Sequence, residues 1–194
     1  MATRNLARIN KNTTLFMMCD MQERFRTITQ KYNEILQVSK KLAIASKILE
    51  RPLIVTEHYK KVMGPTAAEL LEVSKDHANF YEKTKFSMVI PEVEKHLGGI
   101  ESVVLFGIET HVCITQTALD LLARGIDVHL VADASSSRCQ IDRHLALRRL
   151  RNAGVVITTA ESTLFDLVKD AKAPEFKPIS PLVREISPDS GLLL

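Results

Sequence analysis

The chain alternates between two kinds of segment, and this alternation is what most constrains its fold. Short unbroken apolar runs are followed by longer segments whose apolar residues recur at helical spacing. Runs of the first kind are typical of strands that are buried on both faces, as in parallel sheets covered by helices. The expected strands are residues 13–19, 53–56, 102–106, 127–132 and 155–159.

The expected helices lie between these strands, and the order of elements predicts the architecture. They span residues 32–50, 91–97, 112–124, 141–152 and 162–168, while residues 57–87 are the least regular part. We predict a doubly wound, Rossmann-like α/β sandwich of three layers over residues 1–170, with about six parallel strands in the order 3-2-1-4-5-6. Four prolines follow Ala171. We therefore expect the tail, residues 171–194, to be no single regular element and to pack on the domain or on a neighbouring subunit.

Composition excludes several classes of protein. No apolar run in the 194 residues approaches a membrane span. With 26 Lys+Arg against 23 Asp+Glu and no Trp, we expect neither a nucleic-acid-binding nor a base-stacking surface. Three Cys make an odd count, which favours a reducing, cytoplasmic location. The basic start, Met1 to Lys11, leaves a mitochondrial presequence as an alternative to a short solvated arm.

Candidate catalytic residues stand where the expected strands end. Ligands of such sheets bind at the carboxyl ends of the strands. Asp20 follows the first strand, and Cys113 stands at the start of a helix after the central one. A helix start favours a thiolate and offers N–H groups to an oxyanion, and a carboxylate can take the thiol proton. This pattern favours acyl transfer, although a cysteine at a helix start is also compatible with simple packing.

The chain resembles the isochorismatase-like hydrolases, also called cysteine hydrolases, a family that includes nicotinamidases and N-carbamoyl amino acid amidohydrolases. The segments that carry the resemblance are CDMQERF (19–25), EKTKFSM (82–88), GIETHVCITQTALDLLARGIDVHLVADASSSR (107–138) and ALRRLRNAGVVITTAESTLFDL (146–167). It is similar in particular to the isochorismatase domain-containing proteins, some of which have been described as mitochondria-associated ribonucleases.

The resemblance implies a catalytic triad. Its members are Asp20 in D-x-Q-x-x-F, Lys83 in K-x-x-[YF]-S and Cys113 in G-x-x-T-x-x-C, with Phe86-Ser87 excluding Lys85. It also implies a cis peptide between Ile108 and Glu109, and an oxyanion hole formed by the N–H groups of Glu109 and Cys113. The implied reaction is hydrolysis of a small amide or related C–N bond through a Cys thioester, without a cofactor.

Other residues near the strand ends are candidates for contact with the substrate or for a metal site. Gln22, Phe25 and His58 are candidates to line the substrate pocket. We expect no metal, because Thr56-Glu57-His58 lacks the Asp-x-His of the metal-binding nicotinamidases, and His77 alone does not complete a set of ligands.

Cys19 is expected in the core, on the opposite face of its strand from Asp20. We expect His111 to be a loop residue or to lie behind the site, and residues 135–137, three serines, to form a loop and helix cap. The basic helix around Arg148 is expected to face solvent or another subunit, and Cys139 is given no role.

Two other functions stay open. One is a ribonuclease or RNA-binding protein, and the other is a catalytically silent oligomeric scaffold. The tail residues Leu182, Val183 and Leu192 to Leu194 would suit a homo-oligomer contact. The sequence does not decide whether residues 57–81 form a lid or an interface, and it does not name the substrate.

Overall fold

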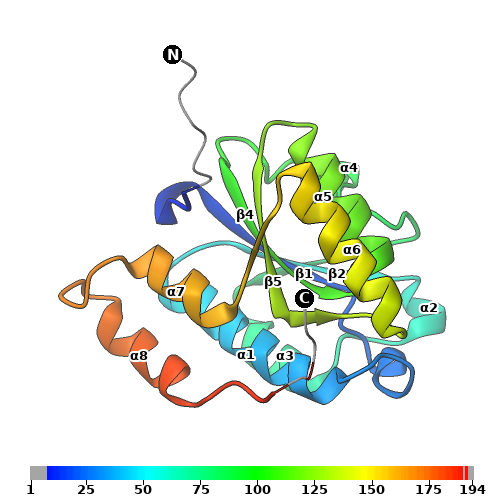
Figure 1. Ribbon diagram of the computed structural model, residues 1–194, viewed down its shortest axis with the longest axis horizontal. Coiled ribbons are helices and arrows are strands. Elements are labelled where there is room, and N and C mark those ends of the chain that lie inside the picture. Colours follow the sequence, from blue (N-terminus) through cyan, green and yellow to red (C-terminus); the bar gives the residue numbers. More distant parts are fainter. Residues whose placement is uncertain (1–7, 190, 192–194) are drawn as a thin grey trace.

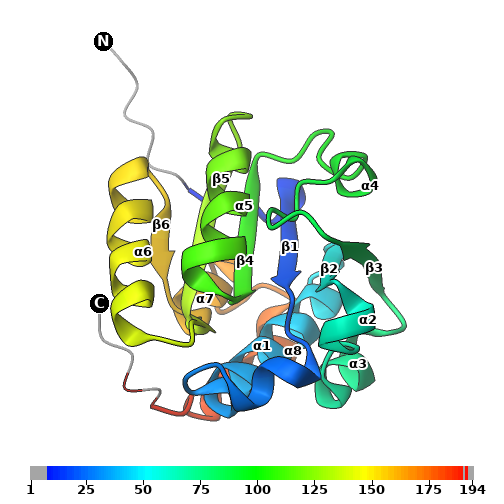
Figure 2. The same cartoon turned by 90° about the vertical axis from the view of Figure 1, so that its right-hand side faces the viewer.

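The computed structural model describes residues 8–189 and 191. At its centre lies a six-stranded sheet with the order β3-β2-β1-β4-β5-β6, which can be followed across Figure 2. Neighbouring strands all run parallel, so the predicted α/β architecture and strand order are confirmed. The strands are β1 (Thr14–Cys19), β2 (Leu53–His58), β3 (Ala78–Lys83), β4 (Ser102–Ile108), β5 (Asp127–Ser136) and β6 (Val156–Thr158).

Helices cover both faces of the sheet, as Figure 1 shows. One face carries α1 (Tyr32–Ile48), α3 (Ala68–Ser74), α7 (Ala160–Val168) and α8 (Phe176–Arg184). The other carries α4 (Pro91–Glu94), α5 (Thr115–Leu122) and α6 (Gln140–Ala153). Helix α2 (Lys60–Met63) and the helical turns η1 (Lys11–Thr13), η2 (Glu23–Thr27) and η3 (Thr110–Ile114) complete the elements.

Strand β1 shows how the sequence fills both cores at once. Phe16 and Met18 lie in the cluster under α1, whereas Leu15 and Met17 lie in the cluster under α5. All four side chains are fully buried. Because successive side chains of a strand point to opposite faces, a central strand is apolar along most of its length. The unbroken apolar run is therefore a direct consequence of burial on both faces.

Strand β3 lies inside the segment that we expected to be irregular, so that expectation was wrong. It is an edge strand that pairs with β2 alone, and most of its side chains are partly exposed. Its sequence, ANFYEK, mixes apolar and polar residues. An edge strand needs no continuous apolar run. The unbroken apolar runs that predicted the other strands are therefore missing from β3.

Two further boundaries differ from expectation. The helix expected over 91–97 is a single turn, Pro91–Glu94. Ser135 and Ser136 belong to β5 rather than to a loop, because the pairing of β4 with β5 shifts register after Leu105 and then continues to Ser136. The hydroxyls of both serines donate to backbone carbonyls, which lets polar residues extend a buried strand.

The tail is not one regular element, but it contains a short helix that we did not anticipate. Helix α8 includes Pro178 and Pro181. Pro178 stands in the first turn, where the N–H has no partner within the helix, and Pro181 is the one interior proline. Ile179 is fully buried, and Leu182 and Val183 pack against the core under α1. Burial of these side chains stabilises the helix despite its prolines.

Both ends of the chain extend beyond the described residues. The basic start is described only from Arg8, so its possible role as a presequence lies outside the described residues, as do Leu192 to Leu194. Among residues 8–189, no helix combines the length and the apolar character that crossing a bilayer requires.

Candidate active site

Asp20 stands directly after β1 and is held by two donors. Its φ of 51° is left-handed, so the strand conformation ends at this residue. The Thr56 hydroxyl donates to Oδ1 at 2.7 Å, and the Lys83 ammonium donates to Oδ2 at 2.6 Å. The carboxylate side chain is 1% exposed. Hydrogen bonds of this kind fix the position of a buried carboxylate.

Lys83 is the last residue of β3, and the fold leaves its ammonium little freedom. Besides Asp20, the Nζ atom donates to the carbonyls of Phe86 at 2.9 Å and Lys85 at 3.2 Å. An ammonium has three N–H donors, so all of them have acceptors. Burial lowers the pKa of Lys83, but the neighbouring cysteines and the ion pair and hydrogen bond with Asp20 outweigh burial, and the pKa is raised. Lys83 therefore stays charged inside the protein.

Cys113 lies in the first turn of a helical segment that begins at Thr110, earlier than predicted. This turn, η3, is π-helical and continues into α5. The carbonyl of Glu109 accepts from the N–H groups of Val112 and Ile114, and Cys113 lies between these two residues. N–H groups in a first turn precede the regular hydrogen-bond ladder. Cys113, which is 7% exposed, therefore lies where this helical segment begins.

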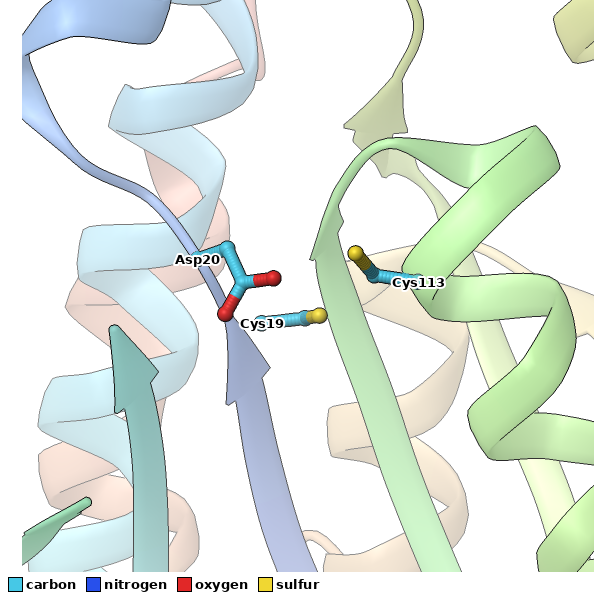
Figure 3. A group of neighbouring side chains, drawn as sticks. All are labelled: Cys19, Asp20 and Cys113. Atoms are coloured by element: carbon cyan, nitrogen blue, oxygen red, sulfur yellow. The ribbon is translucent and has the colours of Figure 1, made fainter. Parts of the chain in front are cut away.

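The fold brings the three predicted triad residues together from three strand ends. The sulfur of Cys113 and a carboxylate oxygen of Asp20 lie within 4.8 Å of each other. Figure 3 shows both groups at the carboxyl ends of β1 and β4. The Asp20–Lys83 ion pair completes the cluster. A thiol, a carboxylate and an ammonium are therefore held together where the sheet opens to its ligand side.

Cys19 lies in this cluster as well, and one part of its prediction was wrong. It is fully buried in the core beside α5, as expected. However, its sulfur lies within 4.8 Å of both the Cys113 sulfur and an Asp20 oxygen. The alternation of faces ends with the strand, and the left-handed backbone of Asp20 brings its carboxylate to the Cys19 side. Burial, followed by the hydrogen bond with Cys113, raises the pKa of the Cys19 thiol.

Glu109 immediately precedes the helical turn that carries Cys113. The peptide bond between Ile108 and Glu109 is cis. The Glu109 carboxylate accepts from the backbone N–H of Arg138 at 2.9 Å and pairs with its guanidinium at 3.2 Å. Next to this pair, the His111 ring and the Ser137 hydroxyl lie 3.0 Å apart. These contacts tie the η3 turn to the end of β5.

Gln22 and Phe25 have roles within the fold. The Gln22 amide donates to the carbonyls of His58 and Gly64 and accepts from the N–H of His58 at 2.7 Å. It is fully buried, so its side chain links the ends of β1 and β2. Phe25 packs in the core under α1, whereas Cys113 belongs to the core on the opposite face. The predicted place of Phe25 in the substrate pocket stays a prediction.

His58 stands beside the triad. Its ring stacks on Phe86, with centroids 5.5 Å apart. Burial lowers the pKa of His58, and the Lys83 charge lowers it further, while the Asp20 charge opposes them. The ring is half-buried, and Phe86 is 48% exposed. This stacked pair forms a partly apolar, partly accessible surface next to the ion pair.

Two threonines of the site were not singled out as functional by sequence reasoning. Thr56 binds Asp20 directly. The Thr117 hydroxyl donates to the carbonyl of Cys113 at 2.6 Å and accepts from the N–H of Met88 at 2.9 Å. It thereby joins the η3 turn to the segment after Lys83. Their positions, at a strand end and one turn after the cysteine, were the available signals.

Among residues 8–189, one group of side chains brings together atoms of the kinds that can bind a metal. It consists of Cys19, Asp20 and Cys113, whose sulfur and oxygen atoms all lie within 4.8 Å of one another. The histidine set considered from the sequence is not assembled. The His77 ring lies 3.1 Å from both the Ser46 hydroxyl and the Ala43 carbonyl, on the α1 side. Glu57 binds Thr66 and Lys60 instead.

The sheet order and the helices on both faces match solved isochorismatase-like hydrolases. The MAR1 ribonuclease of Caenorhabditis elegans superposes with a TM-score of 0.94 at 42% identity, covering 96% of this chain and 97% of that one. YcaC of Escherichia coli, an octameric hydrolase of unknown specificity, superposes with a TM-score of 0.86 at 24% identity, covering 97% of this chain and 95% of that one.

Sequence comparison gives the family. The isochorismatase domain matches residues 14–162. Isochorismatase domain-containing protein 1 of Danio rerio is 48% identical over 97% of this chain and 67% of its own length. Isochorismatase domain-containing protein 2 of Xenopus laevis is 47% identical over 98% of this chain and 93% of its own length. This chain belongs to the isochorismatase family, and the predicted resemblance is confirmed.

Proposed function

We propose that this chain is a cysteine hydrolase that cleaves a small amide or a related C–N bond. The observation that carries the proposal is the buried Asp20–Lys83 ion pair, 2.6 Å long, beside the Cys113 thiol. A carboxylate and a fixed ammonium next to a thiol are the groups that acyl transfer through a thioester requires. The proposal needs no cofactor.

In the proposed reaction Asp20 takes the thiol proton, and the Cys113 thiolate attacks the substrate carbonyl. The backbone N–H groups of Glu109 and Cys113 hold the oxyanion. Asp20 then gives its proton to the leaving amine, and a thioester remains on the sulfur. Asp20 next activates a water molecule, which cleaves the thioester and releases the acid. Lys83 stabilises the negative charge shared by the carboxylate and the sulfur throughout.

Among the candidates for substrate contact, His58 is the one that we retain. It offers a half-buried ring beside the ion pair. We propose that His58 and Phe86 form one wall of the pocket and favour a substrate with a flat or apolar portion. Gln22 then acts by positioning His58, whose backbone it binds on both sides.

The first experiment needs no substrate. Iodoacetamide labelling near pH 7, followed by peptide mass spectrometry, compares Cys113 with Cys139, an exposed cysteine that serves as internal control. We expect Cys113 to react about tenfold faster despite its burial, because only the thiolate is nucleophilic. Lys83→Met should remove this advantage. A Cys113 that reacts more slowly than Cys139 in the wild type contradicts the proposal.

Activity is then tested on a library of small amides and carbamoyl compounds. Cys113→Ser and Asp20→Asn should each abolish turnover, and thermal unfolding of both variants should show that the fold is kept. Full activity of either variant would refute the assigned roles. If every substrate fails while Cys113 is highly reactive, the reaction class rather than the nucleophile is wrong.

A second function has one specific observation in its favour, the 42% identity to a protein described as MAR1 ribonuclease. The outer side of α6 also carries Arg148, Arg149 and Arg151, all exposed. If these residues bind RNA, affinity must fall steeply with salt, since each phosphate contact releases a counterion. Absent or salt-independent binding removes this alternative.

We also propose that the chain forms a homo-oligomer, which the exposed side chains of Ile141 and Leu145 on α6 favour. Sedimentation velocity of the same sample tests this proposal.

A further inference from the structure

Cys19 is a buried thiol that the proposed mechanism does not use. It is the last residue of β1 and is fully buried. Its sulfur points toward the Cys113 sulfur, as Figure 3 shows, and the two lie within 4.8 Å of each other. The third cysteine, Cys139, is exposed and precedes α6. The chain thus holds one buried thiol beside its proposed nucleophile and one exposed thiol that is not part of the cluster.

The geometry of β1 and β4 brings the two thiols together. Cys19 pairs with Gly107 across the two strands. A Cβ on Gly107 would lie 2.2 Å from the Cys19 carbonyl oxygen, so only glycine permits this approach. Immediately afterwards the chain turns into η3, which places Cys113 over the end of β1. The contact is therefore built into the backbone of the site.

We propose that Cys19 is the resolving thiol of a reversible oxidation site, in which a hydroperoxide oxidises Cys113 and Cys19 then closes a disulfide with it. The inference rests on the reactive Cys113 of the proposed function. The oxidant of this site is a small hydroperoxide, such as hydrogen peroxide, that reaches Cys113 through the proposed substrate pocket. The product is a folded, inactive protein that a thiol reductant restores.

The reaction balances in two steps. The Cys113 thiolate attacks one peroxide oxygen, the O–O bond breaks, and sulfenic acid forms while the other oxygen leaves as an alcohol or water after protonation. The Cys19 sulfur then attacks the Cys113 sulfur and displaces the hydroxyl. The Cys19 proton passes through the Asp20 carboxylate to that hydroxyl, which leaves as water. Two thiols lose two electrons in total, and the hydroperoxide gains them.

The surroundings of the two cysteines fix the order of these steps. Cys113 is 7% exposed and lies in a helical first turn, so an incoming peroxide meets it first. Cys19 is sealed from solvent and is held as a neutral thiol, since burial and the neighbouring Cys113 and Asp20 raise its pKa. Disulfide formation needs the sulfurs to approach to about 2.05 Å. Cys19 is the last residue of β1 and Cys113 lies in the η3 turn. The movement that brings the two sulfurs together is therefore confined to the end of β1 and to η3.

The test uses a Cys139→Ser background, which leaves Cys19 and Cys113 as the two thiols. The full chain is treated with a small excess of hydrogen peroxide and analysed by mass spectrometry without reduction. We expect a loss of two hydrogen atoms and a crosslinked peptide pair containing Cys19 and Cys113. Dithiothreitol should restore both the original mass and the iodoacetamide reactivity of Cys113.

The matched variants are Cys19→Ser and Cys19→Ala in the same background, each checked by thermal unfolding. Without Cys19, Cys113 should gain two oxygen atoms as a sulfinic acid that dithiothreitol does not reduce. If the parent protein also forms sulfinic acid and no crosslink, the inference is overturned although a reactive Cys113 still supports the proposed function. If Cys113 reacts with neither peroxide nor iodoacetamide, the proposed function fails together with the inference.

Discussion

The Gln22 side chain joins the ends of β1 and β2. Its amide makes three hydrogen bonds, two with the backbone of His58 and one with the carbonyl of Gly64. Each bond is buried or partly buried, so removing the amide leaves backbone groups without partners. Gln22 therefore fixes the position of His58, which we propose as part of the pocket wall.

Gln22→Leu should lower the free energy of unfolding by about 2–3 kcal/mol, because it removes these bonds without creating a large cavity. Urea unfolding measures the change. The control is Gln37→Leu, at an exposed position of α1, which should stay within about 0.5 kcal/mol of the wild type. Equal effects of the two substitutions would contradict the positioning role.

His129 gives the protein a predictable dependence on pH. Burial lowers the pKa of this histidine, against the opposing charges of Asp127 and Asp166. Below about pH 6.5 His129 becomes protonated in the unfolded chain, whereas in the folded protein it stays neutral until a lower pH. Stability therefore falls as the pH drops from that value through the lower pKa of the folded state.

His129→Leu should remove this part of the pH dependence. Relative to the wild type, the variant should gain stability as the pH is lowered from neutrality, by at most about 1.4 kcal/mol per pH unit. Urea unfolding at several pH values measures the difference. His144→Leu, on the half-buried side of α6, is the matched control. A difference between variant and wild type that does not change with pH would contradict the argument.

At the scale of elements, the close approach of β4 to β1 determines where the site forms. Gly107 has a φ of 114°, and a Cβ there would overlap the backbone of Cys19. Gly107→Ala should destabilise the fold by about 2–4 kcal/mol, through strain and overpacking, and should also slow iodoacetamide labelling of Cys113.

Gly98→Ala is the control for this prediction, because nothing lies within 4 Å of a Cβ at that position. It should change stability by less than about 1 kcal/mol. Differential scanning fluorimetry followed by urea unfolding distinguishes the two variants. If Gly107→Ala were as stable as Gly98→Ala, the close approach of the strands would not be a requirement of the fold.

The elements also show how far the sequence could predict the structure. Central strands were found because burial on both faces favours an unbroken run of apolar residues, as over residues 15–19 of β1. Edge strand β3 was missed, since one paired side and partial exposure relax that requirement. Lys83, at its end, was nevertheless identified from the motif. The proximity of Cys19 to Asp20 was not predictable from strand alternation, which stops at the left-handed Asp20.

At the scale of the whole molecule, the tail completes the core. Residues 171–194 follow the domain in sequence, but α8 packs on α1 and α7. The Lys41 ammonium also donates to the carbonyl of Glu185. We propose that the described part of the tail is integral to the domain rather than an arm for another subunit.

Ile179→Ala tests this proposal. The side chain is fully buried, so the substitution should cost about 2–4 kcal/mol, as large-to-small changes in a core do. The control is Ile186→Ala, since Ile186 is 90% exposed and should contribute less than about 0.5 kcal/mol. Chemical denaturation of the two variants measures the difference. Equal stability would mean that α8 is dispensable to the domain.

The position of α8 has a consequence for biosynthesis. All three proposed triad residues are made by the time Cys113 is added, and β1 already lies in the nascent chain when its partner β4 emerges. The apolar face of α1, however, stays partly uncovered until α7 and α8 have left the ribosome. Domains generally fold as units, so this core closes only after α8 has been translated. A stalled or truncated product would carry a complete set of chemical groups on an open core, a form that chaperones and proteases recognise.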